Sequence, residues 1–570
     1  MKKKLFCFLV IMSLLLTNIS YAQEDIIRLS LARLSIEDQI DLKLNCDCYA
    51  TDDKSSILLK SGSNINLRLI NNKIYIYSDS INICLNAPVK LECVDKSKGF
   101  HINGSSNIYT GDLYIYISDN KLFPVLYIEL EEYLKGVVPY EMSDSFPIEA
   151  LKAQAIAART YALKHLKLQN SFDLVDTTND QVYKGQNSKN TNAILAIEST
   201  KGICGFDGNS LATCYYSGSN GGQTELPQNR WSKSLNIYKM VDDSYDFNNP
   251  NSMVKRFAIK KDNPNLKKSA HNLIANSLIE YAKLYGFDTE YDNIQIDRIN
   301  SISLSSPLYA APSKVMSKIK INLNFSGKKE VPLVGIPTAN PIPSPTPFIY
   351  TFIKSNFTPK PYKNLSEFIP YPEPVNIEIN IFNEARNAFG LSLNGGGKEI
   401  MNVIETDDAF IIESRRFGHG VGMSQRGAEQ MARDGKSYHE ILSYYYPGMT
   451  LDNYKDRNIQ IFKSTDSPVD FNLQYTPEPL KKEPLPTPIP LLWNVPDNIQ
   501  TVIVNKIEEN SFLNLRNEPN LDSLVVRRLY YGQRLVVAED LGEWLHVFIN
   551  KDNPNEAYEG YVVKEFVEFE

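Results

Sequence analysis

The chain has 570 residues, a formal net charge of −7 and 42% hydrophobic residues, a composition typical of a globular protein. Because a single hydrophobic core stops growing at roughly 250–300 residues, three or four domains are expected. The acidic balance argues against nucleic acid as the main partner, since such proteins carry a basic patch. A neutral or weakly charged glycan remains compatible with it.

Residues 1–22 have the organisation of a secretory signal peptide: three lysines, an apolar run and a small residue, Ala22, before the cleavage point. Cleavage brings the charge of the mature chain to −10. An uncleaved anchor is the alternative, but the apolar run is shorter than a membrane-spanning helix needs. We therefore expect an exported protein of the periplasm, cell envelope or exterior, with no transmembrane anchor after signal cleavage.

Six cysteines lie beyond this segment: Cys46, Cys48, Cys84, Cys93, Cys204 and Cys214. In an oxidising compartment they permit up to three disulfides with fifteen possible pairings, and reduced, buried thiols are equally compatible with the sequence. Zinc sites usually show CxxC pairs or nearby histidines, which the Cys-Asp-Cys stretch lacks. We predict neither a metal nor a cofactor.

Residues 23–130 are predicted to form a β-rich part. Segments at 26–31, 65–69, 73–77 and 113–117 alternate apolar with polar or aromatic residues at period two, and turn residues separate them.

The next stretch, YLKGVVPYEM at 133–142, places Glu141 in a tight apolar turn before a strong helical pattern. Burial disfavours a charged carboxylate and raises its pKa, which a general acid needs near neutral pH. The alternative is that Glu141 only lies near a helix N-terminus, where anions are favoured.

The helical pattern predicts a helix over 147–169, with Pro147 at its first position. A second helix is expected at 190–200, followed by a hairpin that turns at Asp207 and Gly208. Three residues can cap the first helix: Ser143, Asp144 and Ser145.

The hairpin leads to SGSNGGQTE at 217–225, which is too rich in glycine for a strand. Such a backbone allows close approach to a ligand, although a plain flexible loop is equally compatible. The first half of a catalytic core is placed at 131–245.

Residues 246–380 read as an insertion, with a predicted helix at 273–285 and a strand at 315–325. Eleven prolines between 332 and 374 indicate an extended spacer. A folded segment resumes at 384–390, and we expect it to return to the same core, whose second half is placed at 381–460.

That second half contains SRRFGHGVGMSQRGA at 414–428, which combines a histidine, a serine and a glutamine with glycines. A helix is predicted from 428 to about 446, ended by Pro447. A helix N-terminus with exposed N–H groups can bind oxygen-rich ligands. Taken alone, a histidine such as His419 is more often a structural residue or an ordinary surface histidine.

A Pro-rich linker at 461–498 precedes a small predicted β-barrel at 499–570. Its strands are expected at 500–504, 512–515, 525–529, 534–538, 544–548 and 559–563.

Four motifs in this order resemble the stage II sporulation protein D family, which includes the amidase enhancer proteins. They are YLKGVVPYEM, ALKAQAIAARTY at 150–161, DTTNDQVYKG at 176–185 and GHGVGMSQRGA at 418–428. The last segment, with LNLRNEP, GEWLHV and GYV, resembles a bacterial SH3-like domain.

The resemblance implies a lytic transglycosylase that acts on peptidoglycan glycan strands stripped of stem peptides. It places the catalytic acid on Glu141 and an arginine needed for activity on Arg159. The implied fold is α+β, a β-rich core with a few helices around a glycan groove. The candidates for lining that groove are Gln181, Tyr183, Ser217, Gln223, His419, Ser424 and Gln425.

The sequence also departs from the family. Zinc ligands found in some members are replaced by Ser171, Val175, Asn179 and Asp180, and a glycine two residues before Gly418 is replaced by Arg416. A non-catalytic wall-binding protein that stimulates a cell-wall amidase is the alternative to the enzyme, and an outright hydrolase is a third hypothesis.

Overall fold

The computed structural model describes residues 25–331, 363–463 and 501–569, with gaps at Asp79, 232–233, 394–397, 507–511, 517–518, 520–524, 531–533 and 550–557. The chain divides into two compact units, 1–475 and 476–570. The predicted signal peptide and most of the two Pro-rich segments lie outside the described residues. No helix in the described ranges is long and apolar enough to cross a membrane.

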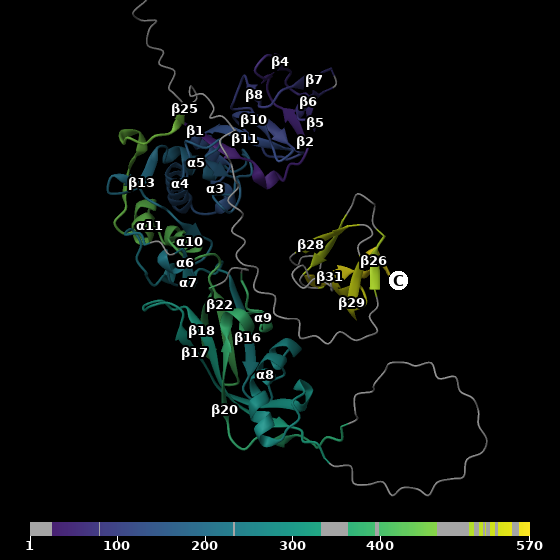
Figure 1. Ribbon diagram of the computed structural model, residues 1–570. Helices are drawn as coiled ribbons and strands as arrows, with labels where there is room; N and C mark the ends of the chain where they lie inside the picture. The colour runs from purple at the N-terminus through teal and green to yellow at the C-terminus, as the bar shows by residue number, and fades with distance from the viewer. Residues whose placement is uncertain are drawn as a thin grey trace, which may run out of the picture. The chain divides into compact units, whose positions relative to one another are not determined.

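Two antiparallel-rich sheets open the first unit and confirm the predicted β-rich start (Figure 1). The larger sheet has the order β12-β1-β11-β10-β8-β3-β4, and β25 also pairs with β1; the smaller has the order β7-β6-β5-β2-β9. The elements are β1 (Asp25–Ser30), η1 (Ala32–Leu34), β2 (Gln39–Leu44), β3 (Cys48–Thr51), β4 (Ser56–Leu59), β5 (Asn64–Ile70), β6 (Lys73–Tyr77), β7 (Asn82–Leu85), β8 (Val89–Cys93), β9 (Phe100–Ile102), β10 (Asp112–Ser118), β11 (Lys121–Glu129), β12 (Leu174–Val175) and β25 (Phe462–Lys463).

Four helices follow β11: α2 (Leu130–Lys135), α3 (Val138–Glu141), α4 (Ile148–Lys164) and α5 (Thr191–Ser199). The prediction of α4 is confirmed, but the helix ends at Lys164 rather than at 169. The predicted side-chain cap is wrong, because Pro147 occupies the N-cap position and no side chain caps the helix. Small residues such as Ala155 and Ala158 let most of α4 lie buried in the main core.

The rest of this core comes from two stretches of the first unit, 203–248 and 423–456. Its elements are β13 (Ile203–Asp207), β14 (Ser210–Leu211), β15 (Tyr216–Ser217), α6 (Gln228–Trp231), α7 (Ser244–Asn248), β23 (Met423–Ser424), α10 (Gln425–Arg433), α11 (Tyr438–Tyr445), β24 (Thr450–Asn453) and η4 (Tyr454–Asp456). The predicted hairpin is confirmed, but its turn lies one residue later than predicted, at Gly208 and Asn209, because Asp207 still pairs with Ser210. The second strand, β14, has only two residues.

The single helix predicted over 428–446 is wrong, because the chain forms two helices there. Gly435 adopts a φ of +83°, which ends α10, and Ser437 then starts α11 with a capping box to Glu440. The break turns the chain so that α10 and α11 both pack on α4.

The insertion folds around its own hydrophobic core, which extends to Ile412. Residues 384–390 therefore pack in this second core and not in the first, as Ala385 and Phe389 show. The elements are β16 (Val254–Lys260), α8 (Lys268–Tyr285), η2 (Tyr291–Asn293), β17 (Ile294–Pro307), β18 (Met316–Gly327), β19 (Ile369–Pro370), β20 (Val375–Asn380), η3 (Ile381–Ala385), α9 (Arg386–Ala388), β21 (Ile400–Glu405) and β22 (Ala409–Arg415).

The second unit is a seven-stranded sheet in the order β28-β27-β31-β30-β29-β26-β32. All six predicted strands are confirmed, and β32 is an addition. The elements are β26 (Thr501–Val504), β27 (Phe512–Arg516), β28 (Val525–Tyr530), β29 (Arg534–Asp540), β30 (Trp544–Ile549), β31 (Tyr558–Val563), η5 (Lys564–Phe566) and β32 (Val567–Phe569).

Candidate active site

Glu141 is the last residue of α3, a single helical turn that contains Pro139 near its start. The backbone becomes extended at Met142, whose side chain is buried in the main core. This change of direction leaves the Glu141 side chain at the core margin, half-buried and partly open to solvent.

The surroundings of Glu141 favour its protonated form. Burial raises the pKa of this carboxyl above its usual value, and three weaker influences oppose the rise: a hydrogen bond from Gln425, one from the Val182 backbone N–H, and the charge of Lys184. The Gln425 Nε2 atom lies 3.4 Å from Glu141 Oε2. Among the described residues, no cation forms an ion pair with Glu141.

Gln425 reaches Glu141 because a short parallel bridge fixes the start of α10. Ser217 in β15 pairs with Ser424 in β23, and the Gly218 carbonyl accepts a hydrogen bond from the Arg426 N–H. Ser424 then caps α10 by accepting from the Gly427 N–H at 3.0 Å. Two segments that are about 200 residues apart in the chain, 217–219 and 417–426, therefore meet beside the turn that contains Glu141.

Asp246 in α7 holds the glycine-rich loop in place. Its buried carboxylate accepts hydrogen bonds from the N–H groups of Gly221 and Gly222, at 2.6 and 3.1 Å. It also accepts from the hydroxyls of Ser219 and Ser424, at 2.9 and 3.1 Å. One aspartate thus joins the loop at 217–225 to the cap of α10, which makes this loop a fixed part of the site.

Arg416 occupies a position whose backbone conformation suits a glycine. Its φ is +89°, a conformation that glycine adopts readily and other residues rarely do. The fully buried guanidinium donates to Glu225 Oε2 at 3.2 Å and to the carbonyls of Asn220 and Gln223 at 3.0 and 3.1 Å. Its side chain therefore braces the glycine-rich loop from the inside.

Gln181 lies between two tyrosines close to Glu141. Its Oε1 accepts from the Tyr133 hydroxyl at 3.1 Å, and its Nε2 donates to the Tyr216 hydroxyl at 2.9 Å. Tyr183 is fully buried and stacks on Tyr133, with ring centroids 5.7 Å apart. Gln181 and Tyr183 are therefore buried beneath the turn that contains Glu141, and their side chains do not face solvent.

Arg159 has a partner other than Glu141. It is fully buried and forms a two-pronged ion pair with Glu131, at 2.9 and 2.7 Å. Its remaining N–H groups donate to the carbonyls of Ile203 and Ile197. The arginine therefore ties α4 to α2, α5 and β13, and the structure does not bring it to Glu141.

Of the remaining candidates, His419 and Gln223 have structural partners and Ser217 has no side-chain partner among the described residues. His419 accepts from the Val421 N–H at 3.0 Å through Nδ1 and interacts with the Tyr216 backbone, and burial lowers its pKa to about 3, so the ring is neutral. Gln223 Nε2 donates to Asp242 and to the Pro312 carbonyl, both at 3.0 Å. Ser217 is buried, and its hydroxyl has no partner among the described residues.

One residue at this site escaped the sequence prediction. Trp231 in α6 is 45% exposed, and its ring lies 4.6 Å from the Tyr215 ring and 4.9 Å from the His419 ring, measured between centroids. An exposed tryptophan beside two other rings indicates a ligand-binding surface only when the fold is known, because the sequence does not show which side chains are exposed.

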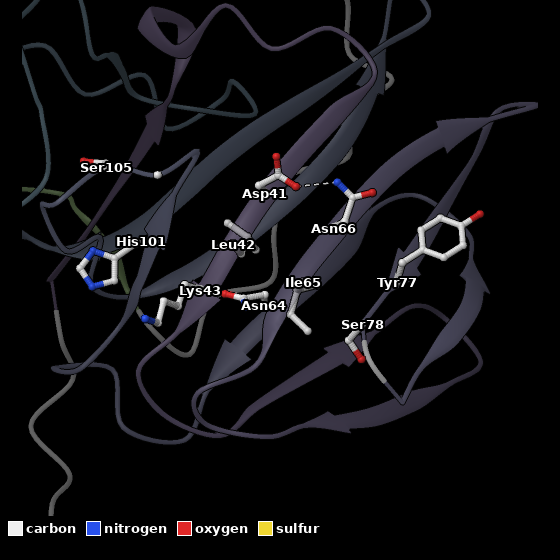
Figure 2. Close-up of a pocket in the computed structure, with 11 residues that line it drawn as sticks. Asp41, Leu42, Lys43, Asn64, Ile65, Asn66, Tyr77, Ser78, His101 and Ser105 are labelled. Carbon is white, nitrogen blue, oxygen red and sulfur yellow. Dashed lines mark hydrogen bonds between the residues drawn. The ribbon is translucent and has the colours of Figure 1, made fainter.

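A separate cavity of about 650 Å³ lies on the small N-terminal sheet (Figure 2). It is lined by β2, β5 and neighbouring residues, with Asp41 accepting from Asn66 at 2.6 Å. It contains none of the predicted site residues, so we do not assign it to the same chemistry.

Two stretches of the chain match known family models. Residues 118–204, which include Glu141 and Arg159, match the family model described as stage II sporulation protein, and residues 511–568 match the bacterial SH3 domain. The chain therefore contains one stretch similar to stage II sporulation proteins and one similar to bacterial SH3 domains. The resemblance read from the motifs is thereby confirmed, and the α+β fold class with it.

Individual related proteins are similar to this chain over a longer stretch than the family model covers. The amidase enhancer of Bacillus subtilis is 31% identical over 323 residues, covering 56% of this chain but only 40% of that protein. The stage II sporulation protein D of Bacillus amyloliquefaciens is 26% identical over 346 residues, covering 57% and 74%. An uncharacterised protein of Brachyspira hyodysenteriae is 26% identical over 444 residues, covering 77% and 96%.

Proposed function

We propose that the chain is an exported lytic transglycosylase that cleaves the bond between N-acetylmuramic acid and N-acetylglucosamine in peptidoglycan glycan strands. The observation that carries this proposal is the environment of Glu141. It is a half-buried carboxyl whose pKa is raised by burial, with an amide donor on one side and no ion-paired cation among the described residues. A general acid needs this combination of partial access and retained proton.

In the first step, the protonated Glu141 donates its proton to the glycosidic oxygen as the bond to C1 of the muramic residue breaks. In the second step, the Glu141 carboxylate accepts the proton of the muramic C6 hydroxyl, and O6 closes onto C1. The products are a 1,6-anhydro-muramic end and a new N-acetylglucosamine end, and no water is consumed.

This mechanism needs one carboxylate where most glycosidases use two. The groups that shift the pKa of Glu141 are Gln425, Val182 and Lys184, with no acidic group among them. Gln425 and the Val182 N–H both donate to the carboxyl group, and these contacts restrict its orientation. The exposed ring of Trp231 provides a surface on which a sugar ring can stack.

The second candidate is a wall-binding protein that stimulates an amidase without cleaving glycan itself, and the similarity to the amidase enhancer favours it. Retention of Arg159 does not separate the two candidates, because its pairing with buried Glu131 serves the fold in both. The raised pKa of Glu141 favours the enzyme, since a binding protein has no need for a protonated acid.

Digestion of purified, amidase-treated glycan strands tests the proposal. Mass spectrometry is expected to detect 1,6-anhydro-muramic ends, with no isotope incorporated from ¹⁸O-labelled water. Label at a new reducing end would instead identify a hydrolase. Tight binding of the strands with no cleavage would support the amidase activator and overturn the enzyme.

A further inference from the structure

Three cysteines whose role the sequence left open meet in the N-terminal sheets. Cys46 follows β2, Cys48 begins β3 and Cys93 ends β8, and their sulfur atoms all lie within 4.8 Å of one another. All three side chains are buried, with exposed fractions of 6%, 0% and 2%. This cluster lies outside the chemistry proposed for Glu141.

The sheet register places two of these cysteines directly opposite each other. Cys48 pairs with Cys93 across the antiparallel strands β3 and β8. The Val94 N–H donates to the Asp47 carbonyl, while the Cys93 N–H donates to Asp112 Oδ1 and not to Cys48. Cys48 and Cys93 therefore occupy a non-hydrogen-bonded position, where Cα atoms are about 4.5 Å apart and side chains approach most closely. This spacing falls within the range of disulfides, about 4.4–6.8 Å.

We propose that Cys48 and Cys93 are oxidised to a cross-strand disulfide and that Cys46 remains a thiol. The Cys48 and Cys93 sulfurs are 3.0 Å apart, whereas the Cys46 and Cys48 sulfurs are 3.9 Å apart. Cys46 has its own partner, because its thiol donates to the Asp95 carbonyl at 3.3 Å. The bond would link residues 45 positions apart and join β3 to β8 covalently.

The oxidant is a disulfide-bearing compound, either oxidised glutathione or a protein of the thiol oxidoreductase class. One cysteine thiolate attacks the disulfide of the oxidant, forms a mixed disulfide and releases one thiol. The second cysteine thiolate then attacks the mixed disulfide, which releases the second thiol. Two protein thiols thus lose two electrons and two protons, and the disulfide of the oxidant becomes two thiols.

A metal ion suits this cluster less well than a disulfide does. With metal–sulfur bonds of about 2.3 Å, the sulfurs of a tetrahedral site are separated by about 3.8 Å, which exceeds the Cys48–Cys93 distance. Three buried thiolates would also be required, and burial raises the pKa of Cys46 and disfavours its charged form. A disulfide is neutral, so burial does not oppose it.

Peptide mapping of the full chain after oxidation by a glutathione redox buffer tests the proposal. Free thiols are blocked with N-ethylmaleimide in denaturant, the chain is digested without reduction, and the peptides are identified by mass spectrometry. We expect a peptide containing residues 46–48 linked to the peptide of Cys93. Because Cys46 and Cys48 share a peptide, fragmentation should find the blocking group on Cys46.

Cys46→Ser and Cys84→Ser serve as matched variants and should both retain the linkage, since Cys84 is exposed and outside the cluster. Dithiothreitol should lower the melting temperature of the wild type and of both variants by several degrees. A linkage of Cys46 to Cys93, or three blocked thiols after oxidation, would overturn the proposal. So would one equivalent of Zn²⁺ retained by the reduced chain that shields all three thiols from blocking.

Discussion

At the scale of single residues, Glu141 and Arg159 show how differently two motif residues can be placed. Glu141 lies at the margin of the core with an amide neighbour and a raised pKa. Arg159 lies inside the core, with every guanidinium contact made to Glu131 or to backbone carbonyls. We infer that Glu141 carries the chemistry and that Arg159 positions the helices around it.

The pKa of Glu141 predicts a pH dependence. A carboxyl with a raised pKa keeps its proton to higher pH, so activity that needs the acid is lost as pH rises through this pKa. Gln425→Leu removes a hydrogen bond that lowers the pKa, and the alkaline limb of the kcat/KM profile should therefore move to higher pH. Gln430→Leu, in the same helix and with its side chain donating to Asp434, is the control and should leave the profile unchanged.

Loss of kcat by about tenfold is also expected for Gln425→Leu, because a donor that orients the acid is missing. If the alkaline limb of the kcat/KM profile stays in place or moves to lower pH, the hydrogen bond assigned between Gln425 and Glu141 is contradicted.

Arg159→Met should unfold or strongly destabilise the first unit. It leaves the Glu131 carboxylate buried without its ion-pair partner, which costs about 3–5 kcal/mol in the free energy of unfolding. Urea denaturation measures this cost, and Glu131→Gln combined with Arg159→Met should recover part of it. A stable, folded Arg159→Met protein that has lost only activity would instead place Arg159 in the chemistry.

At the scale of elements, the loops at 217–225 and 416–425 form one assembly, held by Asp246 and by the Arg416–Glu225 ion pair. The tip of the β17–β18 hairpin adds a further contact, since the Lys314 N–H donates to Gln223 at 2.8 Å. The insertion therefore supports the glycine-rich loop and is not only a spacer.

Arg416→Gly tests this assembly. Glycine would relieve the positive φ, but Glu225 would keep a buried carboxylate without its partner. Since relief of backbone strain is worth about 1 kcal/mol and loss of a buried partner about 3 kcal/mol or more, the variant should be less stable. Arg416→Gly with Glu225→Gln should be more stable than Arg416→Gly alone in thermal denaturation. An Arg416→Gly protein as stable as the wild type would refute the bracing role.

Local patterns predicted much of the fold and little of the site. Period-two strands such as β6 and the alanine-rich α4 depend on nearby residues, so the sequence alone identified them. The capping box that starts α11 was visible as Ser437 and Glu440, but a continuous apolar pattern concealed the break. The contacts of Arg416 join residues 191 positions apart, and no local pattern specifies such a pair.

At the scale of the whole molecule, the two compact units are expected to unfold independently. Calorimetry of the full chain should show two transitions, and removal of residues 476–570 should abolish one without shifting the other. The shortened protein should cleave soluble glycan strands at the wild-type rate and bind intact cell walls more weakly, if the SH3 domain serves as the wall anchor. Equal retention of both proteins in a cell-wall pelleting assay would contradict that role.

The central claim is that Glu141 is the acid and base of a glycan-cleaving enzyme. Its most direct test compares Glu141→Gln with Glu149→Gln on amidase-treated glycan strands, measuring 1,6-anhydro-muramic ends by mass spectrometry. Glu149 bonds Lys152 and the Tyr438 N–H, so its variant controls for loss of a glutamate in the same region. We predict that Glu141→Gln releases these ends at least a hundredfold more slowly while still binding the strands, and that Glu149→Gln behaves as wild type. Release of anhydro ends by Glu141→Gln at the wild-type rate would contradict the account.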